Sequence, residues 1–64
     1  MKTYQVEEMA GETPVSGYTV IANTPWEAAT IGTKKEVQAR RNEPSWVRVT
    51  EETGGTEVYK YAFK

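Results

Sequence analysis

The amino-acid sequence predicts an α+β fold with the order ββαββ, in which a four-stranded antiparallel sheet carries one helix packed on one face. Three observations lead to this prediction. Two segments, 3–9 and 17–23, alternate polar and apolar residues, and a strong helix start follows them at Thr24. Two more alternating segments, 45–51 and 56–64, end the chain.

The first two expected strands are half-buried. Their apolar residues recur at every second position, which places one side of each strand on the core. These in-phase residues are Tyr4, Val6, Tyr18, Val20 and Ala22. The stretch between the two strands, AGETPVSG, contains Gly, Pro and Ser, and we expect it to be a loop.

The helix start is the clearest local signal in the chain. Thr24 is a favourable N-cap residue, a proline occupies the first helical position, and Glu27 completes a capping box. We expect the helix to run to Arg40 or Arg41, because two cations suit the carbonyl end of a helix. Residues 42–44, Asn-Glu-Pro, then end it.

The helix offers two weak apolar stripes at helical spacing. One contains Trp26, Ala29, Thr33 and Val37, and the other contains Ala28, Ile31, Gly32 and Ala39. The small residues of the second stripe would let the helix lie close to tyrosine rings and leave Trp26 and Val37 partly exposed. The opposite orientation remains open at this stage.

The last third predicts a β-hairpin around Gly54–Gly55. A two-residue loop there would place Val49 across from a lysine. A three-residue loop over 53–55 places Val49 across from Tyr59 and puts a glycine at the third loop position, where a left-handed residue is favoured. We therefore expect the three-residue loop.

If the four strands are numbered as they follow one another in the chain, an antiparallel sheet can arrange them side by side as 2-1-3-4 or as 1-2-4-3. In both arrangements the two strands that flank the helix point the same way. The sequence does not choose between the two orders. Strand parity places the following residues under the helix: Tyr4, Val6, Tyr18, Val20, Ala22, Val47, Val49, Tyr59, Tyr61 and Phe63.

The opposite, helix-free face carries the candidate binding site. By parity it holds Thr3, Gln5, Thr19, Ile21, Trp46, Arg48, Thr50, Val58, Lys60 and Ala62, and one helix leaves nothing to cover them. Tryptophan and arginine are enriched where interfaces gain their energy. The predicted binding residues are Trp46, Arg48, Lys60, Ile21 and Val58. We expect this face to bind a second copy as a homodimer, or another protein.

Two alternatives remain for this face. The first is weak binding of single-stranded nucleic acid, with Trp46 as a stacking platform among Lys and Arg side chains. The helix-end cations, Lys34, Lys35, Arg40 and Arg41, would support it. In the second alternative Trp46 lies over its cross-strand neighbours with the Arg48 and Lys60 stems flattened around it, and the face has no binding role.

Composition narrows the possible chemistry. The chain has no His, Cys or Asp, so histidine-based catalysis, thiol nucleophiles and the usual zinc sites need residues it does not contain. The adjacent glutamates at 7–8 and 51–52 point to opposite sides of a strand and do not converge on one substrate or metal. We therefore expect no enzyme activity, no metal and no cofactor.

Length, charge, cysteine content and the N-terminal segment lead to the expected domain count and cellular location. The 64 residues suit one domain, 1–64, and the net charge of -1 gives no overall positive potential for nucleic acid. The absence of cysteine favours a reducing compartment. The N-terminal segment resembles neither a signal peptide nor a membrane span. We expect a soluble cytoplasmic protein that does not contact membranes, and the small size suggests a bacterial or phage origin.

Overall fold

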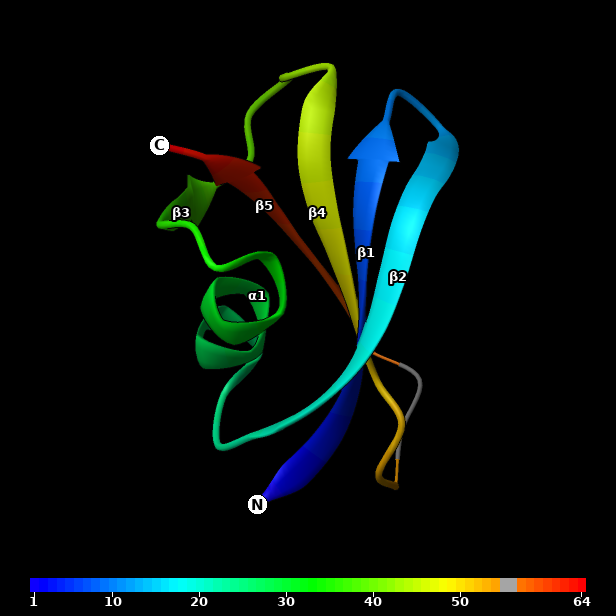
Figure 1. Ribbon diagram of the computed structural model, residues 1–64, viewed down its shortest axis with the longest axis vertical. Coiled ribbons are helices and arrows are strands. Elements are labelled where there is room, and N and C mark those ends of the chain that lie inside the picture. The colour runs from blue at the N-terminus through cyan, green and yellow to red at the C-terminus, as the bar shows by residue number, and fades with distance from the viewer. Residues whose placement is uncertain (55–56) are drawn as a thin grey trace.

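The computed structural model describes residues 1–54 and 57–64. Five strands and one helix follow one another in this part of the chain (Figure 1). They are β1 (Lys2–Ala10), β2 (Thr13–Ala22), α1 (Pro25–Thr33), β3 (Val37–Ala39), β4 (Ser45–Glu51) and β5 (Val58–Phe63).

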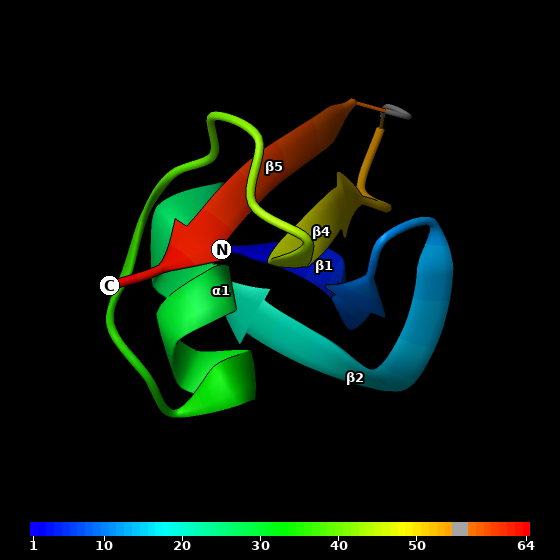
Figure 2. The same cartoon turned by 90° about the horizontal axis from the view of Figure 1, so that it is seen from above.

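The strands form one antiparallel sheet in the order β2-β1-β4-β5-β3. The sheet is strongly twisted, and α1 lies on one of its faces (Figure 2). The α+β class and the single helix are confirmed. The four expected strands take the first of the two open orders, and β3 is a fifth strand that the sequence did not predict.

β1 and β2 are longer than expected. The stretch AGETPVSG was predicted to be a loop, but most of it extends the two strands, and the turn is confined to Gly11 and Glu12. Gly11 has a φ of 62°, which a glycine adopts without steric penalty. A β-bulge beside Glu8 absorbs one extra residue, Val15, and lets the longer pairing continue.

The start of α1 agrees with the prediction. The Thr24 hydroxyl accepts a hydrogen bond from the Glu27 N–H at 3.1 Å, and the Glu27 carboxylate accepts one from the Asn23 N–H at 3.5 Å. The first bond is the predicted N-cap, because it satisfies a backbone donor that the first turn cannot pair internally. The second bond reaches the N–H of Asn23, one residue before the cap, and not that of Thr24, so the predicted capping box forms only in part.

The predicted end of the helix is wrong: α1 stops at Thr33 rather than at Arg40 or Arg41. Lys34 adopts a left-handed conformation with a φ of 60°, and its N–H bonds to the Thr30 carbonyl. β-Branched residues and Gly32 give the last turns low helix propensity. The helix-end role assigned to the two arginines is therefore also wrong.

The chain beyond α1 instead returns to the sheet as β3. Val37 pairs with Phe63 of β5, and its side chain is fully buried. Burying an isopropyl group in the core stabilises the fold by about 1.5–3 kcal/mol, more than one further helical turn of this sequence offers. Arg40 and Arg41 consequently lie in the connection between β3 and β4.

α1 packs on the sheet through residues from both predicted stripes. Ala28 and Ala29 are fully buried, and a Cβ added at Gly32 would lie 2.9 Å from a Val6 methyl group. Small residues thus allow close approach of the helix to the sheet. Trp26 stays 46% exposed, with its ring edge against Tyr61 at 5.3 Å between centroids.

The hairpin register is confirmed. Val49 pairs with Tyr59, and Val47 pairs with Tyr61. Gly54 has a φ of 75°. The left-handed glycine expected at Gly55, and the start of the last strand at Thr56, lie outside the described residues.

Most of the predicted core is buried as expected. The buried cluster contains Tyr4, Val6, Val20, Ala22, Ala28, Ala29, Val37, Val47, Val49 and Tyr61, with Tyr59 and Phe63 packed against it. Tyr18 is the exception: it is 41% exposed, because α1 does not extend over its part of β2. Its hydroxyl donates to the Glu8 carboxylate instead.

Candidate binding site on the helix-free face

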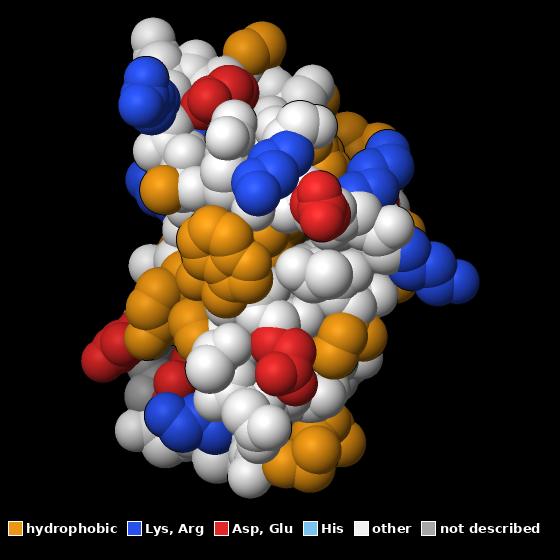
Figure 3. All heavy atoms as spheres, turned by 90° about the vertical axis from the view of Figure 1, so that its left-hand side faces the viewer, with side chains coloured by type: hydrophobic (Ala, Val, Ile, Leu, Met, Phe, Trp, Pro, Cys, Tyr) orange, Lys and Arg blue, Asp and Glu red, His pale blue; other side chains and the backbone are white. Residues whose placement is uncertain are grey.

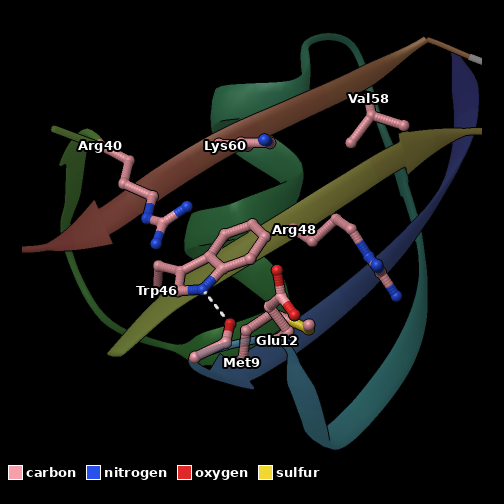
Figure 4. A pocket seen from close by; sticks show the side chains of 8 residues that line it. Met9, Glu12, Arg40, Trp46, Arg48, Val58 and Lys60 are labelled. Carbon is pink, nitrogen blue, oxygen red and sulfur yellow. Dashed lines mark hydrogen bonds between the residues drawn. The ribbon is translucent and has the colours of Figure 1, made fainter. Parts of the chain in front are cut away.

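The helix-free face, which is the side of the sheet opposite α1, holds a pocket of about 600 Å³ (Figure 4). We call it the Trp46 pocket. Its lining residues are Met9, Gly11, Glu12, Arg40, Trp46, Arg48, Val58 and Lys60. The structure therefore brings together four of the five predicted binding residues. Ile21, on the edge strand β2, does not line the pocket.

Trp46 is 5% exposed, so the prediction that nothing covers this residue is wrong. Its indole Nε1–H donates to the Gly11 carbonyl at 2.6 Å. The Gly11 N–H in turn donates to the Pro44 carbonyl at 2.7 Å. The turn between β1 and β2 and the connection between β3 and β4 thus meet beside the indole and bury it within one molecule.

Arg40 completes the cover of Trp46. Its guanidinium carbon lies 4.1 Å from the indole centroid, close enough for a cation–π interaction. Its Nε and Nη2 donate to the Glu43 carbonyl at 3.2 and 3.1 Å. These bonds hold the planar guanidinium over the ring.

The Glu43 side chain also stabilises the connection between β3 and β4. Its carboxylate accepts hydrogen bonds from the N–H groups of Arg41 at 2.8 Å and Asn42 at 2.9 Å. The bond from Arg41 is the largest cause that lowers the pKa of Glu43 below its ordinary value. At neutral pH the Glu43 carboxylate is therefore ionised, and its hydrogen bonds stabilise the connection between β3 and β4.

The other two cations of the pocket differ in their partners. Arg48 donates from Nε and Nη2 to the Glu7 carboxylate at 3.0 and 2.8 Å, which neutralises much of its charge. Lys60 Nζ lies 5.8 Å from the indole centroid. Among the described residues, no carboxylate oxygen lies within 4 Å of Lys60 or Arg40.

Sequence reasoning did not place Met9, Gly11, Glu12 or Arg40 beside Trp46, although it named Arg40 as one of the helix-end cations. Met9 pairs with Trp46 and is buried, and continued alternation along β1 would have placed it on this face. Arg40 gave no such signal, because it was assigned to a helix. Glu12 was assigned to a loop whose direction the sequence does not set.

The arrangement suits binding of an anionic group. Arg40 and Lys60 converge on one indole, and an anion between them would satisfy two charges that are not paired within the described chain. Residues 1–54 and 57–64 contain no group of three or more side chains that could hold a metal ion. In the same residues, no helix is long and apolar enough to cross a membrane.

A second exposed apolar region lies on the other side of the molecule. Hydrophobic side chains gather in the middle of the side that carries α1 (Figure 3). Trp26 and Ile31 of α1 are both about half exposed. Nothing in the described structure indicates what would cover them.

Comparison of the chain with models of known protein families, with curated proteins and with solved structures finds no match. The Trp46 pocket is therefore the feature of this chain that bears on its function.

Proposed function

We propose that this chain is a non-catalytic protein-interaction domain that uses its helix-free face, and that the Trp46 pocket binds an acidic segment of a partner protein. The observation that supports the proposal is the convergence of Arg40 and Lys60 on the buried Trp46 ring. A carboxylate entering between the two cations would form charge-assisted hydrogen bonds. The exposed Val58 supplies an apolar contact at the pocket wall.

The buried state of Trp46 favours this partner over single-stranded nucleic acid. A stacking platform needs an accessible ring face, and 5% exposure leaves almost none. The pocket also contains Glu12, and Glu7 neutralises Arg48 nearby. Together these features suit one or two carboxylates better than a phosphate backbone with a charge at every step.

Self-association through this face, which the sequence favoured, stays a prediction. The predicted dimer interface had Trp46 as its apolar centre, but in the structure Arg40 covers the Trp46 ring. Strand parity places two of the exposed large apolar side chains, Ile21 and Val58, on this face, and of these only Val58 lines the pocket. A dimer that buries this face would therefore bury little apolar surface.

NMR titration of the ¹⁵N-labelled chain with an octaglutamate peptide tests the proposal. The Trp46 indole N–H, bonded to Gly11, reports directly on the pocket. We expect saturable shifts there, with a Kd of about 0.1–1 mM that weakens as salt is raised. An Arg40→Gln/Lys60→Gln double variant should lose most of this binding. Arg41→Gln, a neighbouring change outside the Trp46 pocket, should keep it.

Octaglutamine and an eight-nucleotide thymidine strand serve as comparison ligands. Octaglutamine, with its termini acetylated and amidated as in the octaglutamate peptide, should cause no shift at the Trp46 indole, because its side chains carry no charge. Binding of the oligonucleotide without the peptide would replace the proposal by the nucleic-acid alternative. No shift at the Trp46 indole with any acidic ligand at millimolar concentration would overturn it.

A further inference from the structure

β2 is one edge of the sheet. It pairs with β1 on one side, and in the described structure no strand lies on its other side. Every second residue of an edge strand directs its backbone N–H and C=O outward, where they are available to another strand. β2 is also one of the two longest strands, extending from Thr13 to Ala22.

The features that normally protect an edge occur only in the first part of β2. Pro14 lacks an N–H, and the bulge at Val15 interrupts the ladder. Beyond them, the segment Gly17–Ala22 contains no proline and no charged residue. The opposite edge, β3, is only three residues long and is followed by two arginines.

Apolar side chains lie on both sides of this unprotected segment. Tyr18 pairs with Val6 on the helix side of the sheet, and Ile21 pairs with Thr3 on the helix-free side. Tyr18 is 41% exposed and Ile21 is 62% exposed. A strand added at this edge would cover apolar surface on both faces of the sheet.

We propose that Gly17–Ala22 pairs antiparallel with the same segment of a second copy, so that two five-stranded sheets join into one. The chain between Glu12 and Glu27 is uncharged, so pairing with itself brings no like charges together. A two-fold axis perpendicular to the sheet keeps each face continuous with the same face of the partner copy. Pairing of this kind does not involve the Trp46 pocket, because no residue of Gly17–Ala22 lines that pocket.

Sedimentation equilibrium of the full chain tests the association with a matched pair of variants. We expect the wild type to approach twice its mass of 7.2 kDa between about 10 and 500 μM. Ile21→Lys places a charge at the edge and should weaken the dimer at least about tenfold, which is 1.4 kcal/mol. Val58→Lys changes an exposed residue of β5, which β1 and β4 separate from the β2 edge, and should leave the dimer unchanged.

Amide hydrogen exchange of the wild type tests the pairing independently of any variant. Every second amide in Gly17–Ala22 should become slower to exchange as the chain concentration rises, while the amides of β3 should not change. A wild type that stays monomeric at 500 μM would overturn the proposal. So would a dimer that Val58→Lys disrupts and Ile21→Lys does not, because that pattern locates the interface on the helix-free face. Peptide binding at the Trp46 pocket is scored separately, so either proposal can fail alone.

Discussion

The Arg40 guanidinium lies 4.1 Å from the centroid of the Trp46 ring and is held there by two hydrogen bonds to the Glu43 carbonyl. This contact explains why a tryptophan on the helix-free face is buried. It also places in the pocket lining a cation that has no carboxylate within 4 Å among the described residues. The stability of this region and its proposed binding role therefore depend on the same side chain.

Replacing Arg40 with alanine removes this cover. We expect the free energy of unfolding to fall by about 1–2 kcal/mol, because the cation–π contact and the packing of the arginine stem are both lost. Trp46 emission should shift to the red in a Trp26→Phe background, which leaves one tryptophan as reporter. Arg41→Ala, in an exposed neighbour, is the control and should change stability by less than about 0.5 kcal/mol. An unchanged emission maximum in Arg40→Ala would contradict the described cover.

Tyr59 should make stability fall at high pH. Its hydroxyl donates a hydrogen bond to the Glu57 carboxylate, and this bond is the largest cause that raises the pKa of Tyr59 to about 12. A raised pKa means that the folded state binds the proton more tightly than the unfolded state, whose tyrosine titrates near 10. The stabilisation is complete below about pH 10 and is lost between about pH 10 and 12.

Glu57→Gln tests this coupling. The pKa of Tyr59 should move back toward 10, as followed by the ¹³C shifts of its ring in an NMR titration. Tyr61 is the internal control, since burial rather than Glu57 is the main cause that raises its pKa. A Tyr59 titration that is the same in both proteins would show that the hydrogen bond does not form in solution.

Gly32 is required by close packing rather than by backbone conformation. Alanine would gain up to about 1 kcal/mol of helix propensity, but its Cβ would lie 2.9 Å from the Val6 Cγ1 methyl group. Overpacking of a buried site costs about 1–3 kcal/mol, so we expect Gly32→Ala to lower the free energy of unfolding on balance. In a Val6→Ala background the same change should be neutral or stabilising. Chemical denaturation of the four proteins in this cycle measures the coupling.

Lys34 offers a stabilising substitution. Its left-handed φ of 60° costs a residue with a side chain about 1 kcal/mol relative to glycine. Lys34→Gly should therefore raise the midpoint of urea unfolding. Lys35→Gly at the next position should lower or preserve the midpoint, because Lys35 is not left-handed and its Nζ lies 5.1 Å from the Phe63 ring centroid. Equal effects of the two changes would argue against the described helix end.

The Tyr4 hydroxyl is buried and has no hydrogen-bond partner among the described residues. An unsatisfied buried hydroxyl costs about 1–3 kcal/mol, so Tyr4→Phe should preserve or raise the free energy of unfolding. Tyr18→Phe provides the contrast, since it removes a hydroxyl that donates to Glu8 at 3.3 Å. Loss of more than about 1 kcal/mol in Tyr4→Phe, measured by urea unfolding, would show that the hydroxyl has a partner in solution.

The local features of this protein could be read from its amino-acid sequence. Alternation located the four main strands, the capping box located the helix start, and apolar pairing gave the β4–β5 register. Each of these signals depends on residues close in the chain or on a period that the backbone enforces. The Trp46 pocket was half predicted, because parity alone places Trp46, Arg48, Val58 and Lys60 on one face.

The end of the helix and the cover of Trp46 depend on contacts between segments that are far apart in the chain. Val37 leaves the helical pattern to pair with Phe63, a residue 26 positions later, and no local signal reports that competition. Because Val37 joins the sheet, Arg40 lies after β3 rather than in the helix, and its guanidinium contacts the Trp46 indole. The arrangement that buries more apolar surface in the shared core is more stable than one in which each segment follows its local preference.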